Sequence, residues 1–140
     1  MAIRSSTFSY LAGEDRIWIV DRCFHYIGID AYDMYCGGGV FDRMIEWIKE
    51  YLFLTMSKNN YYVRYAIHGP LTLEDKDPNI YLLRYEITIN SDNCSIVEYL
   101  DNAVYRHTSR YISCRIEDLH ELYKCMCDAR DKYESRERRR

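Results

Sequence analysis

The chain has 140 residues, a formal net charge of −3 and 48% hydrophobic residues, with 15 tyrosines among them. This length suits a single domain, and the apolar content excludes an intrinsically disordered chain. The net negative charge argues against nucleic acid as a partner, because nucleic-acid-binding domains usually present a basic face.

The first predicted element is a helix over residues 14–29. Four apolar residues recur at spacings of three and four, which places them on one helical face. These residues are Ile17, Val20, Phe24 and Ile27. Residues 16–20 taken alone also fit a strand, so the choice between helix and strand stays open for this segment.

Residues 40–56 are predicted to form the central helix of the domain. Apolar residues recur in two adjacent rows, so this helix is expected to be buried against two partners. The rows are Phe41, Met44, Ile45, Ile48, Leu52 and Thr55, and Val40, Trp47, Tyr51 and Leu54. Phe53 falls on the polar side of the helix and is a candidate contact point for a partner protein.

Two strands are predicted next, over residues 61–68 and 80–90. Side chains in both segments alternate between two faces, which is the period of a strand. The segments are expected to pair as an antiparallel hairpin closed by a long exposed loop. On the polar face of this hairpin, Arg64 and Arg84 are placed to meet Glu86.

The last third of the chain is predicted to form a helix, a strand and a helix. Ser95 and Glu98 fit a capping box at the start of a helix over residues 95–104. Residues 110–116 alternate as a third strand. Residues 117–134 begin with two acidic residues, which suit a helix N-terminus, and then carry apolar residues on one face.

Together these elements predict an α+β domain, with a small, mostly antiparallel sheet of about three strands packed with about four helices. The domain is expected to span residues 1–134, followed by a basic tail at 135–140 that frays. No apolar run approaches the roughly 18–20 residues that a membrane helix needs, and the N-terminus lacks the pattern of a secretory signal. We therefore expect a cytoplasmic protein that does not bind membranes, whose six cysteines are reduced thiols.

The strongest local hint of chemistry is Cys36, which precedes three glycines and the central helix. Free backbone N–H groups and the helix dipole at such a place favour an anion and activate a thiol as a nucleophile. The pattern invites comparison with cysteine phosphatases, but Asp42 stands where those enzymes need an arginine. A small thiol-dependent enzyme using Cys36 is therefore the alternative function.

Metal and cofactor sites are not predicted. Cys23 and His25 are separated by one residue, as are Cys125 and Cys127, and His120 lies nearby. Structural zinc sites usually need two knuckles with wider spacing, and no such pair of knuckles occurs. Dinucleotide, Walker and serine-hydrolase motifs are also missing from the sequence. The sequence thus predicts no catalytic residue, no metal and no cofactor.

A non-enzymatic protein-interaction module is the leading hypothesis. Besides Phe53, the acidic loop that carries Glu74, Asp75 and Asp77 offers contacts to a protein partner. The edge of the predicted sheet offers another, because a partner can add a strand there. Self-association into a homo-oligomer also stays open.

Three segments share a similar amino-acid composition. Residues 59–62, 87–93 and 111–114 read Asn-Asn-Tyr-Tyr, Ile-Thr-Ile-Asn-Ser-Asp-Asn and Tyr-Ile-Ser-Cys. This richness in Tyr, Ile, Asn and Asp, together with free cysteines, resembles the small accessory proteins of poxviruses. The resemblance rests on composition and carries over no functional residue. It implies a protein of the host cytoplasm that binds a host or viral protein.

Overall fold

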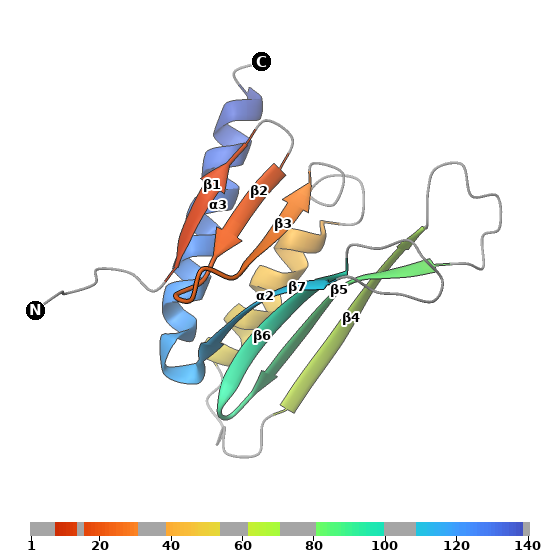
Figure 1. The fold of residues 1–140 in the computed structure, drawn as a ribbon. Coiled ribbons are helices and arrows are strands. Elements are labelled where there is room, and N and C mark those ends of the chain that lie inside the picture. The colour runs from red at the N-terminus through yellow and green to blue at the C-terminus, as the bar shows by residue number, and fades with distance from the viewer. Residues whose placement is uncertain are drawn as a thin grey trace, which may run out of the picture.

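The computed structural model describes residues 8–13, 16–30, 39–53, 62–70, 81–99 and 109–138. Within these residues the chain forms seven strands and two α-helices, which confirms the α+β class (Figure 1). The elements in chain order are β1 (Ser9–Ala12), β2 (Arg16–Val20), β3 (Tyr26–Asp30), α2 (Val40–Leu52), β4 (Tyr62–Pro70), β5 (Tyr81–Asn90), β6 (Asn93–Tyr99), β7 (Ser109–Arg115), the short 3₁₀ turn η1 (Ile116–Asp118) and α3 (Leu119–Arg138).

The strands form two antiparallel sheets. Sheet A has the order β1-β2-β3, and sheet B has the order β4-β5-β6-β7. Strand β3 of sheet A lies beside β6 and β7 of sheet B, so the two sheets meet along that edge. Helix α3 packs on β1, β2 and β7, and α2 packs on α3 and β5 (Figure 1). The helices therefore pack on one face of each sheet, and neither described helix packs on the other face of sheet A.

The core lies between the sheets and the helices. Each sheet contributes a set of buried isoleucines, because alternate residues of a strand point to the same face. Sheet A supplies Ile17, Ile19, Ile27 and Ile29, and sheet B supplies Ile87, Ile89, Ile96 and Ile112. The helices add Phe41, Met44, Ile45, Ile48, Leu122 and Met126. Burying each of these side chains is worth about 1.5–3 kcal/mol.

The central helix matches its prediction in position and in burial. It starts at Val40, after Gly39, whose φ of 68° lies in the left-handed region that favours glycine. Its buried residues come from both predicted apolar rows, and it has two partners, α3 and β5. It ends at Leu52, four residues before the predicted end. No described helix is long and apolar enough to cross a membrane.

The prediction of a helix over residues 14–29 is wrong. Arg16–Val20 and Tyr26–Asp30 are strands β2 and β3, which pair with each other in an antiparallel hairpin. The isoleucines of both strands point inward at every second position, and this alternation coexists with the helical spacing that the same segment shows. The segment forms strands and not a helix because β2 pairs with β1 on one side and with β3 on the other.

The prediction of a helix over residues 95–104 is also wrong for residues 95–99, while residues 100–104 lie outside the described part of the chain. Asn93–Tyr99 is the strand β6, which pairs with β5 and β7. Ser95 and Glu98 therefore form no capping box, and Glu98 points into the protein instead. The described residues hold two α-helices and not four, because both of the other predicted helices are strands.

Strands β4, β5 and β7 follow the prediction, whereas β1 was not predicted. β4 and β5 form the expected antiparallel hairpin, and Ser109–Arg115 is the expected strand. The predicted pair between Arg64 and Glu86 is present, with 2.6 Å between Nη2 and Oε2. Both side chains belong to the outer face of the hairpin, so the pair adds little stability.

Candidate functional site

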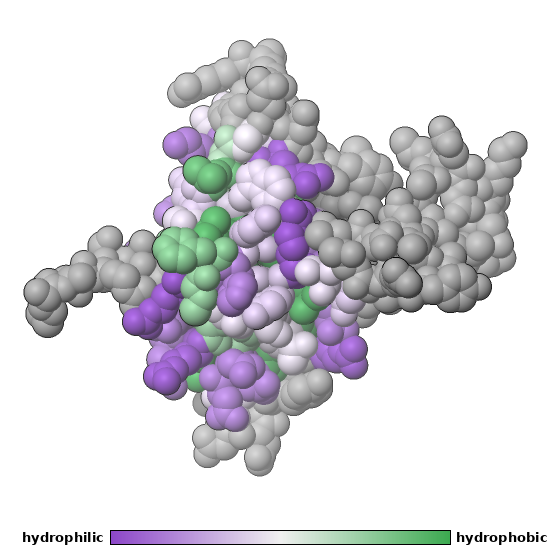
Figure 2. All heavy atoms as spheres, viewed as in Figure 1, coloured by the Kyte–Doolittle hydropathy of each residue, from purple (hydrophilic) through white to green (hydrophobic). Residues whose placement is uncertain are grey.

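The open face of sheet A carries apolar and aromatic side chains. Because the isoleucines of β2 and β3 point inward, their neighbours point outward. We call the outward set Leu11, Trp18, Val20 and Tyr26 the aromatic face. Leu11 lies opposite Trp18, and Val20 lies opposite Tyr26, in the register of the sheet. Figure 2 shows hydrophobic side chains gathered over β1, β2 and the loop that follows.

The aromatic face is open to a partner. Its four side chains line a shallow hollow of about 330 Å³, and Leu11 is 66% exposed. The rings of Trp18 and Tyr26 meet edge to face at 5.6 Å between centroids, which fixes both rings. Neither described helix covers this face: α3 packs on β1 and β2 on the side of their buried residues, and α2 packs on α3 and β5.

The loop between β2 and β3 extends this apolar surface. Phe24 sits in it with 84% of its surface exposed and with φ at 65°. A left-handed backbone costs a bulky residue about 1–2 kcal/mol, and glycine or asparagine avoids that cost. Phe24 is thus a large aromatic side chain that is mostly exposed to water on a strained backbone, so it contributes little to core packing. Such strain is often found at functional positions.

A glycine lets the rings lie flat on the sheet. Gly28 of β3 lies under Trp18 and Arg16, and a Cβ there would be 3.0 Å from the indole ring. The guanidinium of Arg16 lies 5.1 Å from the centre of the Trp18 ring, close enough for a cation–π contact. A side chain at position 28 would push the side chains of Trp18 and Arg16 away from the strand.

Sheet B holds the aromatic face in place through a buried carboxylate. Glu98 accepts a hydrogen bond from the backbone N–H of Gly28 at 2.8 Å and two from the guanidinium of Arg110 at 3.1 Å. Tyr85 donates its hydroxyl to the carbonyl of Gly28 at 2.9 Å. The outward backbone N–H and C=O of Gly28 are thereby satisfied by side chains rather than by another strand.

Arg110 links the buried carboxylate of Glu98 to the aromatic face. Its guanidinium lies 4.9 Å from the ring centre of Trp18 and 5.3 Å from that of Tyr26. Burial works to lower the pKa of Arg110, but the hydrogen bond and the charge of Glu98, with a smaller contribution from Tyr26, outweigh burial and raise it. The arginine is therefore a permanent cation beneath two rings.

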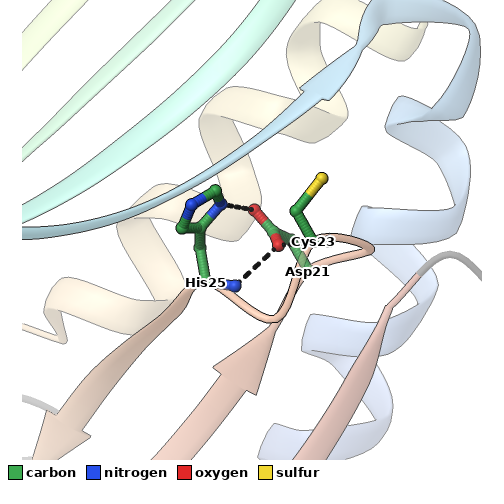
Figure 3. Close-up of side chains that lie close together, drawn as sticks. All are labelled: Asp21, Cys23 and His25. Carbon is green, nitrogen blue, oxygen red and sulfur yellow. Dashed lines mark hydrogen bonds and ion pairs between the residues drawn. The ribbon is translucent and has the colours of Figure 1, made fainter.

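A second cluster lies in the β2–β3 loop, beside the aromatic face. Asp21 is buried, and its side chain is only 2% exposed. Its Oδ1 accepts the backbone N–H groups of Cys23 and His25, both at 2.9 Å, and its Oδ2 accepts the N–H of Ser113 in β7 at 3.2 Å. One carboxylate thus shapes the loop, as its bond to the backbone of His25 shows in Figure 3, and its bond to Ser113 ties the loop to sheet B.

The loop brings three potential metal ligands together. The Nδ1 of His25 lies 3.3 Å from Oδ2 of Asp21, and the Cys23 thiol projects from the same loop (Figure 3). Ligand atoms of the three residues all lie within 4.8 Å of one another. The other ring nitrogen of His25, Nε2, is 3.3 Å from the hydroxyl of Tyr111, and the two rings stack.

The other described cysteines suit a structural role. All five described cysteines are free thiols, as the sequence predicted. A hydrogen bond with Cys114, burial and the charge of Cys114 raise the pKa of Cys94 well above its usual value. Burial, with a smaller effect of Asp128, raises the pKa of Cys125 to about 12. Both thiols stay protonated at neutral pH and are poor nucleophiles.

The residues singled out from the sequence have different outcomes. Phe53 is 67% exposed at the end of α2, so it remains available as a contact point. Cys36 and the acidic residues Glu74, Asp75 and Asp77 lie outside the described residues. The thiol-enzyme alternative and the acidic interaction loop therefore stay predictions.

Sequence reasoning missed the aromatic face, because it placed Trp18 and Tyr26 in a helix. It also missed Asp21, although Asp, Cys and His at alternate positions of one short segment are a readable signal. No family model, curated protein or solved structure matches this chain.

Proposed function

We propose that this protein is a non-enzymatic interaction module that binds a partner protein through the aromatic face. The observation that carries the proposal is the open apolar surface of sheet A, extended by Phe24 on a strained backbone. Contiguous apolar surface of this kind marks binding sites in folded proteins. Tryptophan and tyrosine are also the residues that most often dominate binding energy at interfaces.

The surface suits a partner that offers apolar side chains. Trp18 and Tyr26 are rigid rings held from below, so they lose little conformational freedom on binding. Arg16 and Arg110 border the rings and favour carbonyl or carboxylate groups near the apolar contact. Following the compositional resemblance, the partner is a host or viral protein, and the compartment is the cytoplasm, where thiols stay reduced.

Site-directed crosslinking tests the position of the interface. A photoreactive amino acid is placed at Leu11 in one variant and at Phe53 in another, and each is irradiated in cells. These positions form a matched pair, because the two side chains are 66% and 67% exposed. We expect a discrete crosslinked partner from position 11 and none from position 53.

Affinity measurements then test the energetics with the purified partner. Leu11→Asp puts a charge on the aromatic face and should weaken binding by about thirtyfold or more, the usual effect of a dominant interface residue. Phe53→Asp is the control and should leave the affinity within about twofold, as expected outside an interface. If Phe53→Asp abolishes binding and Leu11→Asp does not, the aromatic face is the wrong surface.

A further inference from the structure

The β2–β3 loop carries a second site, which is independent of the aromatic face. We propose that Asp21, Cys23 and His25 bind one transition-metal ion of the Zn²⁺ class. The three residues supply a carboxylate oxygen, a thiolate sulfur and an imidazole nitrogen, which are the ligand types that zinc takes in proteins. A sulfur ligand also excludes Mg²⁺ and Ca²⁺, which prefer oxygen.

The distances fit a tetrahedral ion. In a tetrahedral zinc site, neighbouring N and O ligand atoms are about 3.4 Å apart, and S and O ligand atoms about 3.6 Å. The Nδ1 of His25 and the Oδ2 of Asp21 are already 3.3 Å apart. Since all three ligand atoms lie within 4.8 Å of one another, the thiol of Cys23 has to approach by no more than about 1.2 Å to complete the set. Cys23 is exposed, so its side chain can turn.

The contact between Oδ2 of Asp21 and Nδ1 of His25 can be made in two ways. Either Nδ1 carries a proton and donates it to Oδ2, or the proton lies on Nε2 and a metal ion can sit between the two lone pairs. When His25 holds its proton on Nε2 instead, that N–H faces the hydroxyl of Tyr111 at 3.3 Å. The Tyr111 hydroxyl can accept that hydrogen bond, which supports the tautomer that leaves Nδ1 free as a ligand, a common role of residues behind a metal site.

The site is shaped in advance by the loop. Oδ1 of Asp21 is held by two backbone N–H groups of the loop, which orients the carboxylate and leaves Oδ2 facing His25. A hollow of about 330 Å³ adjoins the cluster, with Asn93 and Asp118 on its wall, and gives room for a water as the fourth ligand.

Binding changes the proton count in a defined way. The thiol of Cys23 loses its proton to solvent when the sulfur–metal bond forms. The neutral imidazole of His25 keeps its proton, which moves from Nδ1 to Nε2. A dipositive ion then faces one carboxylate and one thiolate, so the occupied site is close to neutral. Metal affinity should consequently rise with pH.

Cobalt titration tests the site directly, because Co²⁺ replaces Zn²⁺ and reports a bound thiolate by charge-transfer absorption. The full-length protein is titrated with Co²⁺ under reducing, oxygen-free conditions, and Zn²⁺ is then added to compete. We expect one equivalent of Co²⁺, a thiolate band in the near ultraviolet, and displacement by one equivalent of Zn²⁺. Cys23→Ser should remove the band, and His25→Gln should weaken binding by about tenfold or more.

The variants are chosen so that folding does not confuse the result. Cys23 and His25 are exposed, whereas Asp21 is buried and is left intact. Tyr111→Phe should lower affinity by about tenfold through the tautomer of His25. Cys127→Ser and His120→Gln are matched controls on α3 and should bind as the unaltered protein does. The absence of stoichiometric binding, a band that survives Cys23→Ser, or an equal loss in the controls would overturn the proposal.

Discussion

Replacing Glu98 by alanine should destabilise the protein by about 3–5 kcal/mol, the usual cost of removing one partner of a buried ion pair. The side chain of Glu98 is 9% exposed and accepts hydrogen bonds from Gly28 and Arg110. Its removal leaves the N–H of Gly28 without an acceptor, which costs about 1–3 kcal/mol. The rest of the loss comes from the guanidinium of Arg110, whose side chain is mostly buried.

Two further variants separate these contributions. Glu98→Gln keeps an acceptor for Gly28 and removes the charge, so we expect a smaller loss of about 1–2 kcal/mol. Arg110→Met removes the cation and keeps much of the bulk beneath the rings. The double variant should show a coupling of about 1–3 kcal/mol between positions 98 and 110, as residues in one hydrogen-bonded pair do.

Urea unfolding followed by tryptophan fluorescence gives the free energy of unfolding of the unaltered protein and of each variant. In a Trp47→Phe background the signal comes from Trp18, which lies over Arg110 and reports the aromatic face as well. The reasoning is refuted if Glu98→Ala costs less than about 1 kcal/mol, or if the coupling is below about 0.5 kcal/mol, the range expected of independent sites.

Three other variants test the loop, the strand edge and a buried thiol. Phe24→Gly should raise the free energy of unfolding by up to about 1 kcal/mol, because glycine relieves the left-handed backbone, while it weakens partner binding. Gly28→Ala should lower the free energy of unfolding by about 1–3 kcal/mol, because the new methyl group meets the indole ring of Trp18. The raised pKa of Cys125, about 12 against an ordinary value of 9.0, gives stability that is complete below pH 9 and lost as the pH rises toward 12. Urea midpoints across that range should therefore fall less steeply for Cys125→Ala than for the unaltered protein.

Local patterns account for the elements that sequence predicted correctly. The central helix has apolar residues on a wide arc over more than three turns, and a strand cannot place them on one side. The hairpin of β4 and β5 alternates over nine and ten residues, which a helix cannot accommodate. In both cases the period is long enough to be unambiguous.

Those patterns could not predict the candidate site, and the reason is physical. In residues 16–29 two overlapping sets of apolar residues fit a helical and a strand period, and only pairing of β2 with β1 and β3 selects the strand. Once the strands form and pair, Trp18 and Tyr26 fall on one outward face. Asp21, Cys23 and His25 are close in sequence, but the bond from Ser113 to Asp21 spans 92 positions.

The sequence by itself determined the size of the core, the α+β class and the two helices, because these follow from composition and from long periodic runs. The tertiary structure alone decided that Glu98 turns inward to Gly28 and Arg110, since its partners come from β3 and β7. A buried charge is tolerated only where distant strands bring donors to it. That meeting of the two sheets holds the rings of the aromatic face, and no run of neighbouring residues encodes it.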